Sequence, residues 1–72
     1  GGFKLLSTDN AVYAVGRNKV AGLSLSPKPS EGSYFDLKDY GEVIDAQIRN
    51  AEMWVLTSEN GQFGLRKIGL IP

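Results

Sequence analysis

The stretch NAEMWVLTSENGQFGLRKIGLIP, residues 50–72, decides the fold, because it places two apolar runs on either side of a polar tip. Four apolar residues stand in a row at 53–56. A strand with one face in water alternates apolar and polar side chains, and this one does not. Asn-Gly at 60–61 is the strongest turn signal in the chain, since both residue types tolerate the positive φ of a tight hairpin turn. The stretch predicts a β-hairpin whose first strand has a second face to cover.

Strand parity puts Trp54 with Leu56 on one face and Met53 with Val55 on the other. We place Met53 and Val55 in the core, which leaves Trp54 partly exposed on the outer surface. The alternative is that Trp54 is simply the largest core residue. We expect the second face to be covered mainly by the N-terminal segment, residues 3–15, with a shallower ligand site beside it.

Working outward from the hairpin, turn signals divide the rest of the chain at regular intervals. The runs between them are short and rich in Val, Ile, Leu, Tyr and Phe: residues 12–15, 20–25, 34–37, 43–48, 53–57 and 62–68. Short apolar runs at even spacing, separated by Gly, Pro, Asn and Asp, are typical of a small all-β sandwich or barrel.

Two of these segments need a closer reading. In the run 43–48, Ile44, Ala46 and Ile48 share one face, which predicts a half-buried strand. Residues 10–15 could instead form a short helix capped by a preceding polar residue. That segment holds two β-branched valines and is barely two turns long, so the sequence favours a strand.

Composition limits the classes of function. A chain of 72 residues makes one domain at most and buries about 60% of its extended surface. It has no Cys and no His, which removes disulfides, zinc clusters and imidazole chemistry. Eight basic and eight acidic residues cancel, which disfavours a nucleic-acid partner, and apolar runs of four residues are far too short to span a membrane. The lack of Cys suits a secreted or cell-wall-associated protein without excluding the cytosol.

The carboxylates do not predict a catalytic site. Asp36, Asp39, Glu42 and Asp45 surround an expected turn, where acidic residues are commonly solvated. A general acid needs an apolar, partly enclosed pocket, for which so small a fold has little room. The serines have no His partner, and the acidic run is too sparse for a calcium loop. We therefore predict a non-enzyme with no metal and no cofactor.

The order of features from residue 20 onward resembles a known family. LKDYGEVIDA, residues 37–46, looks like the pattern Leu-Lys-Lys-Gly-Asp-x-Ile-x-Val of the Src-homology-3 (SH3) barrel. The Trp-bearing strand, the ENGQ turn and the following FGL are similar to that family's distal hairpin. The resemblance implies an SH3-like β-barrel of five to seven short antiparallel strands over residues 19–72. Residues 1–18 would then be an N-terminal extension packing on the barrel.

The match is closer to the bacterial type than to the eukaryotic type. GLSLSPKPSEGS, residues 22–33, looks like the bacterial run Leu-Asn-Val-Arg-x-x-Pro-Ser, although Ser26 or Pro27 replaces the usual Arg. The segment VAGLSLS lacks the tyrosines with which eukaryotic members grip proline-rich peptides. The resemblance therefore implies a cell-wall peptide (peptidoglycan) or another extended chain as the partner.

The predicted ligand surface combines aromatic side chains, a proline-stiffened loop over residues 26–33 and one cation. Of two adjacent aromatics, Tyr34 is expected to face outward because it has a polar hydroxyl, and Phe35 inward. Tyr40 is expected to project to solvent. The alternative is that these are ordinary aromatics at a barrel rim. The predicted ligand-binding residues are Trp54, Tyr34, Tyr40, Arg66, Pro27 and Pro29.

These expectations combine into a non-catalytic module that binds an extended peptide or a cell-wall peptide. The alternative is a structural subunit or fragment of a larger assembly, such as a propeller blade or a phage or virion component, engaged in protein–protein contacts. A nucleic-acid-binding barrel that uses Lys19, Lys28, Arg66 and Lys67 is a third hypothesis, which the neutral net charge disfavours.

Overall fold

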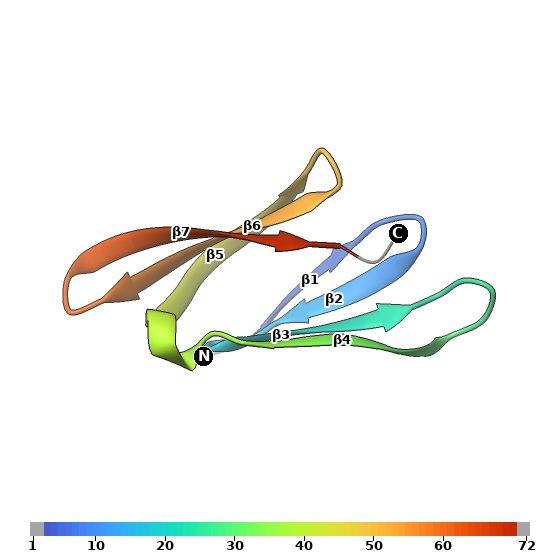
Figure 1. Cartoon of the computed structure of the whole chain (residues 1–72), viewed down its shortest axis with the longest axis horizontal. Helices are drawn as coiled ribbons and strands as arrows, with labels where there is room; N and C mark the ends of the chain where they lie inside the picture. The colour runs from blue at the N-terminus through green and yellow to red at the C-terminus, as the bar shows by residue number, and fades with distance from the viewer. Residues whose placement is uncertain (1–2, 71–72) are drawn as a thin grey trace.

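The computed structural model describes residues 3–70, and this part of the chain is all-β, as predicted. No helix among these residues has the length and apolar character needed to cross a membrane. The elements run in order along the chain and are joined by short turns (Figure 1). Their bounds are β1 (Lys4–Ser7), β2 (Ala11–Val15), β3 (Lys19–Ser24), β4 (Ser30–Asp36), the 3₁₀ helix η1 (Lys38–Tyr40), β5 (Glu42–Arg49), β6 (Glu52–Glu59) and β7 (Gln62–Gly69).

The strands form two antiparallel sheets, each of them a meander of consecutive neighbours. The first has the order β1-β2-β3-β4 and the second the order β5-β6-β7 (Figure 1). All six strands predicted from the sequence are present as β2 to β7, and residues 11–15 form a strand rather than a helix. Strand β1 was not predicted.

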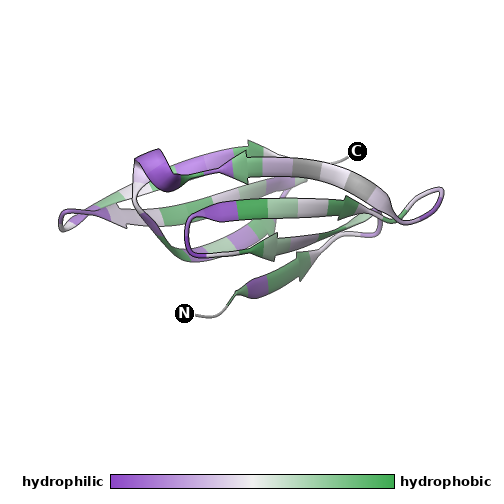
Figure 2. Cartoon of the chain, turned by 90° about the horizontal axis from the view of Figure 1, so that it is seen from below, coloured by the Kyte–Doolittle hydropathy of each residue, from purple (hydrophilic) through white to green (hydrophobic). Residues whose placement is uncertain are grey.

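One core lies between the two sheets. The strands carry alternating hydrophobic and hydrophilic segments, and η1 is hydrophilic (Figure 2). In β2 and β6 burial alternates along the strand, with every second side chain buried. The buried apolar side chains come from both sheets and from the residue before η1: Ala11, Tyr13, Val15, Val20, Leu37, Ala46, Met53, Val55 and Ile68. Burial of these side chains is the main force that holds the sheets together.

The parity predicted for β6 is confirmed. Met53 and Val55 are fully buried, while Trp54 and Leu56 are half-buried on the outer face of the second sheet. The prediction that residues 3–15 cover this outer face is wrong. The alternation of β2 directs Tyr13 inward, so the segment packs against the opposite side of β6, where Met53 and Val55 lie.

The β2–β3 turn accepts two backbone hydrogen bonds, one from the residue between β4 and η1 and one from β5 of the second sheet. The N–H of Leu37 donates to the carbonyl oxygen of Asn18, and that of Val43 donates to the carbonyl oxygen of Arg17, both at 2.7 Å. Residues 1–18 were predicted as an extension. Within them, β1 and β2 belong to the same sheet as β3, with β2 paired directly to β3.

Two hairpin turns in the second sheet use positive φ. Asn60 has a φ of 53° and Gly61 a φ of 79°, as the sequence predicted. The β5–β6 turn has the same form, with Asn50 at 52° and Ala51 at 63°. Alanine pays a steric cost in this region because its Cβ crowds the following carbonyl oxygen. The positive φ of this turn was not predicted, because Asn-Ala is not a favoured pair at such positions.

Two predictions about local structure are wrong. Ile44 does not share a face with Ala46 and Ile48, because the register shifts between Val43 and Asp45 and leaves Ile44 as the extra residue of a bulge, 51% exposed. The predicted loop over residues 26–33 is shorter than expected, since β4 already begins at residue 30.

Candidate binding surface on the second sheet

The outer face of the second sheet is centred on Trp54. In the register of the sheet, Trp54 lies opposite Gln47 of β5 and Lys67 of β7. Leu56 lies opposite Leu65 on the same face. Because β6 is the central strand, its outward side chains contact neighbours on both sides, and such cross-strand contacts are the unit of sheet stabilisation. We call these five residues the Trp54 face.

Two hollows flank Trp54 on this face. One, of about 160 Å³, lies towards Leu56, and the other, of about 380 Å³, lies towards Arg49 and Asn50. Trp54, Gln47 and Leu65 line both of them. Leu65 is 60% exposed, so the apolar floor is open to solvent. A long, open apolar surface with polar margins suits an extended chain better than a compact ligand, which prefers a deep cavity.

A cation lies beside the aromatic ring at the centre of this face. The Nζ atom of Lys67 is 5.5 Å from the centroid of the Trp54 ring and 3.4 Å from a carboxylate oxygen of Glu52. Both side chains of the ion pair are well exposed, so the pair adds little to stability, and the cation–π contact adds about 0.5–1 kcal/mol at such a site. Lys67 therefore lies over the face of the Trp54 ring and places a positive charge at the centre of this surface.

Arg66 and Tyr40 meet at the end of the core. The guanidinium carbon of Arg66 lies 4.0 Å from the centroid of the Tyr40 ring. Arg66 lies opposite the buried Val55 in the register, so it is on the inner side of β7, whereas Lys67 is on the outer side. A hollow of about 130 Å³ beside this pair is also lined by Thr57 and Gly64.

The predicted site residues lie in separate places. Tyr34 faces outward as predicted and is 63% exposed, but it lies on β4 of the first sheet, on the side of the molecule opposite to Trp54. Tyr40 is on η1, and Pro27 and Pro29 are in the β3–β4 turn. The expected cluster of Tyr34, Tyr40 and Trp54 is therefore not formed, because the strands divide between two sheets with one core between them.

Leu56 was predicted to share a face with Trp54, but the other residues around it, Gln47, Leu65 and Lys67, were not predicted as site residues. Leu65 carries a recognisable signal, because it stands four positions after Gly61 of the Asn-Gly turn and its parity in the hairpin puts it beside Leu56. Gln47 has no such signal, since its position opposite Trp54 depends on the turn at Asn50 and Ala51, whose residues do not mark a tight hairpin.

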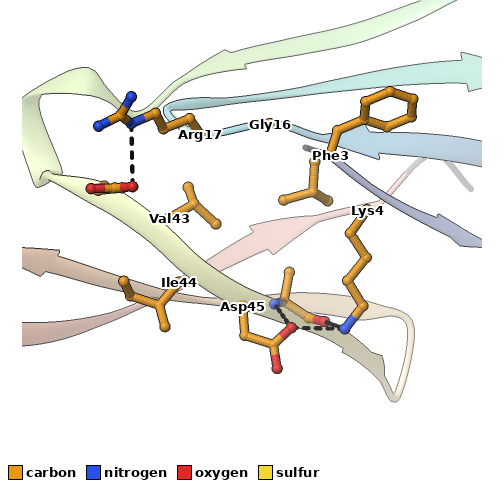
Figure 3. A pocket seen from close by; sticks show the side chains of 10 residues that line it. Phe3, Lys4, Gly16, Arg17, Val43, Ile44 and Asp45 are labelled. Carbon is orange, nitrogen blue, oxygen red and sulfur yellow. Dashed lines mark hydrogen bonds and ion pairs between the residues drawn. The ribbon is translucent and has the colours of Figure 1, made fainter. Parts of the chain in front are cut away.

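Another hollow, of about 210 Å³, lies at the seam where β1 meets β5, and charged contacts join the residues that line it (Figure 3). The Lys4 ammonium donates to Asp45 Oδ1 at 2.7 Å and to the carbonyl oxygen of Ala46 at 2.9 Å. Arg17 Nε lies 3.2 Å from Glu42 Oε1 across the same seam. These contacts tie the edge of one sheet to the edge of the other.

The pKa of Asp45 is lowered from 3.8, first by the hydrogen bond from Lys4 and then by the bond from the N–H of Ala46. Asp45 therefore stays ionised, which is the opposite of what a general acid requires. It lies in β5, within the run 43–48 that was predicted as a strand. Asp36 does act as a turn former, since it accepts the N–H of Lys38 at 3.0 Å. Across residues 3–70, no three acidic side chains come together as metal ligands would.

Comparison with known proteins identifies no relative of this chain. No family model matches it, and neither a curated protein nor a solved structure is significantly similar. The function must therefore be inferred from the surfaces themselves.

Proposed function

We propose that this chain is a non-catalytic binding module that holds an extended peptide against the Trp54 face. One observation carries the proposal: a half-buried Trp54 lies on an open apolar floor of Leu56 and Leu65, with Gln47 and Lys67 on either side. Tryptophan buries a large area on binding at a low cost in conformational entropy, which is why it dominates many interfaces.

The polar margin of the face supports a peptide as the ligand. Gln47, Arg49 and Asn50 line one end of the larger hollow. Their side chains can donate to peptide carbonyl groups, and Gln47 and Asn50 can also accept from peptide N–H groups. A bound peptide would thereby satisfy its backbone groups while its apolar side chains cover Trp54 and Leu65.

The resemblance to SH3-like barrels supports the same proposal. The hairpin of β6 and β7 has the features that the resemblance rests on, a Trp-bearing strand and a tight turn at Asn60–Gly61. We propose that this hairpin takes the part of the family's distal hairpin in a bacterial-type module. Cell-wall peptides and proline-rich peptides are then the two ligand classes to compare.

The test uses Trp54, the single tryptophan in the chain, as its own reporter. Its fluorescence is followed while peptidoglycan fragments and a library of proline-rich peptides are added. The proposal expects one class to shift the emission and Leu65→Ser to weaken that binding. Leu5→Ser is the matched control, because Leu5 is 62% exposed on the outer face of the first sheet. Equal loss in both variants, or no response to any peptide, would refute the proposal.

A structural role in a larger assembly is the second candidate, and one observation favours it. Both outer faces carry exposed apolar side chains, Leu5, Leu23 and Tyr34 on the first sheet and Phe63 and Leu65 on the second. Such faces are common where sheets stack on neighbours. This role expects concentration-dependent self-association in light scattering, reduced by Leu5→Ser and Leu65→Ser alike. A chain that stays monomeric at all concentrations would argue against self-assembly.

A further inference from the structure

The two sheets differ in what lies beside the second strand of a hairpin, which is β3 in the first sheet and β7 in the second. In the first sheet, β3 is paired on one side with β2 and on the other with β4. In the second sheet, β7 is paired with β6 and is the last strand, so within residues 3–70 its other edge has no strand beside it. An edge strand presents unpaired N–H and C=O groups that can pair with another chain.

The hairpin of β2 and β3 is similar to the hairpin of β6 and β7 in its burial pattern and in one dipeptide. Both first strands bury every second residue, and both second strands contain Gly-Leu, at 22–23 and at 64–65. In the first sheet, β4 completes the arrangement: Phe35 packs against the core and Tyr34 lies on the outer face. No described strand does this for β7.

The side chains along β7 define what a strand added at its open edge would contact. On the outer side, Phe63 is 72% exposed and Leu65 is almost as open. On the inner side, Gly64 lines the hollow of about 130 Å³ that Arg66 and Tyr40 also line. An added strand would therefore place apolar side chains outward, over Phe63 and Leu65, and a polar side chain inward, towards Arg66.

The two cations on β7 favour an acidic partner over a second copy of this strand. Arg66 and Lys67 stand next to each other on β7. Lys67 has Glu52 as an ion-pair partner, whereas Arg66 has only the Tyr40 ring and no ion pair among the contacts within residues 3–70. Two copies of β7 paired edge to edge would bring these cations together, which is unfavourable. An acidic strand would instead give Arg66 the carboxylate that suits its planar, forked donors.

We propose that β7 takes up an acidic extended peptide as a fourth strand of the second sheet. The backbone of the peptide pairs with the open edge of β7, one of its carboxylates meets Arg66 beside Tyr40, and its apolar side chains cover Leu65 and Phe63. This mode of binding is strand addition, in which main-chain hydrogen bonds supply affinity and alternate side chains supply specificity. The inference goes beyond the proposed function, because the added strand lies along the edge of β7 and shares only Leu65 with the Trp54 face.

The probe is a capped decapeptide that alternates valine with glutamate. Two companion peptides serve as controls: one alternates valine with lysine, and the other is the valine–glutamate peptide with N-methyl groups on alternate residues, which removes main-chain donors. Binding is measured by NMR titration of the isotope-labelled chain, together with amide hydrogen exchange along β7. We expect the valine–glutamate peptide alone to bind and to protect β7 amides from exchange.

Two charge-removing variants make the test specific. Arg66→Gln is expected to weaken binding of the valine–glutamate peptide roughly three- to tenfold, the range for loss of a partly exposed charge-assisted contact. Lys19→Gln, which removes a charge from β3 of the other sheet, is the matched control and should bind as the parent chain does. Equal binding of the lysine peptide or of the N-methylated peptide would overturn the proposal.

The proposed function and this inference fail in distinguishable ways. A peptide that shifts Trp54 fluorescence and depends on Leu65, yet leaves β7 amides unprotected, would keep the binding function and refute strand addition. A concentration-dependent dimer with protected β7 amides and no peptide present would refute the acidic partner in favour of a second copy. Protection of β7 by the valine–glutamate peptide that needs a higher peptide concentration in Arg66→Gln than in the parent chain would support the inference.

Discussion

The turn at Asn50–Ala51 offers a direct test of the β5–β6 hairpin, because Ala51 occupies a conformation that glycine prefers. Its φ of 63° lies in the left-handed region, which costs a residue with a Cβ about 1–2 kcal/mol. Ala51 is exposed, so its methyl group contributes little packing. Ala51→Gly removes the steric cost but adds about 0.4–1 kcal/mol of unfolded-state entropy. We expect a net gain of about 0.5–1 kcal/mol in the free energy of unfolding.

The assay is urea unfolding followed by Trp54 fluorescence, with thermal unfolding as a second measurement. For a domain of this size, the expected gain raises Tm by roughly 2–8 °C. Gly61→Ala is the reciprocal control, since Gly61 has a φ of 79° and no atom lies within 4 Å of the position a Cβ would take. It should lower stability by a similar amount. A loss of stability in Ala51→Gly would refute the turn and the register of β5 on β6 that depends on it.

Three further predictions concern other parts of the fold. Gly41→Ala should destabilise the chain by about 2–4 kcal/mol in urea unfolding, because Gly41 has a φ of 100° and an added Cβ would collide with the backbone carbonyl of Ser58; a change below about 1 kcal/mol would contradict that packing. Ile48→Ala should cost clearly more stability than Ile44→Ala, since Ile48 packs against the core while the bulge exposes Ile44; equal costs would restore the simple alternation read from the sequence. The lowered pKa of Asp45 means that its contribution to stability is present above about pH 3.8 and is lost as pH falls through the folded-state pKa. Asp45→Asn should therefore be less stable than the parent chain at pH 7, with the difference shrinking in acid, and a pH-independent difference in parallel unfolding curves would contradict the Lys4 contact.

Much of the strand order could be predicted from local sequence signals. The apolar runs of β2 and β6, the spacing of the turns and the Asn60–Gly61 pair depend on neighbouring residues alone, so they can be read from the sequence. The exposure of Ile44 could not, because a bulge is a property of two paired strands and changes the face of every residue beyond it. The turn at Ala51 was also hidden, since an alanine there opposes the local preference.

The candidate site was harder to predict than the strands. That Trp54 faces outward follows from parity once Met53 and Val55 are assigned to the core. Which side chains gather around it depends on the sheet to which each strand belongs, and the sequence carries no local signal for that division. Tyr34 was grouped with Trp54 for this reason, although the two residues lie on different sheets.

Amide hydrogen exchange of the free chain tests the central claim, that the second sheet ends in an open edge at β7 while β3 is paired on both sides. Along β7, we predict that alternate amides exchange rapidly, because only those directed towards β6 are hydrogen-bonded. Along β3, amides directed to either neighbour should be protected. Uniform protection along β7 in the monomeric chain, without any added peptide, would show that the edge is already covered and would contradict the account.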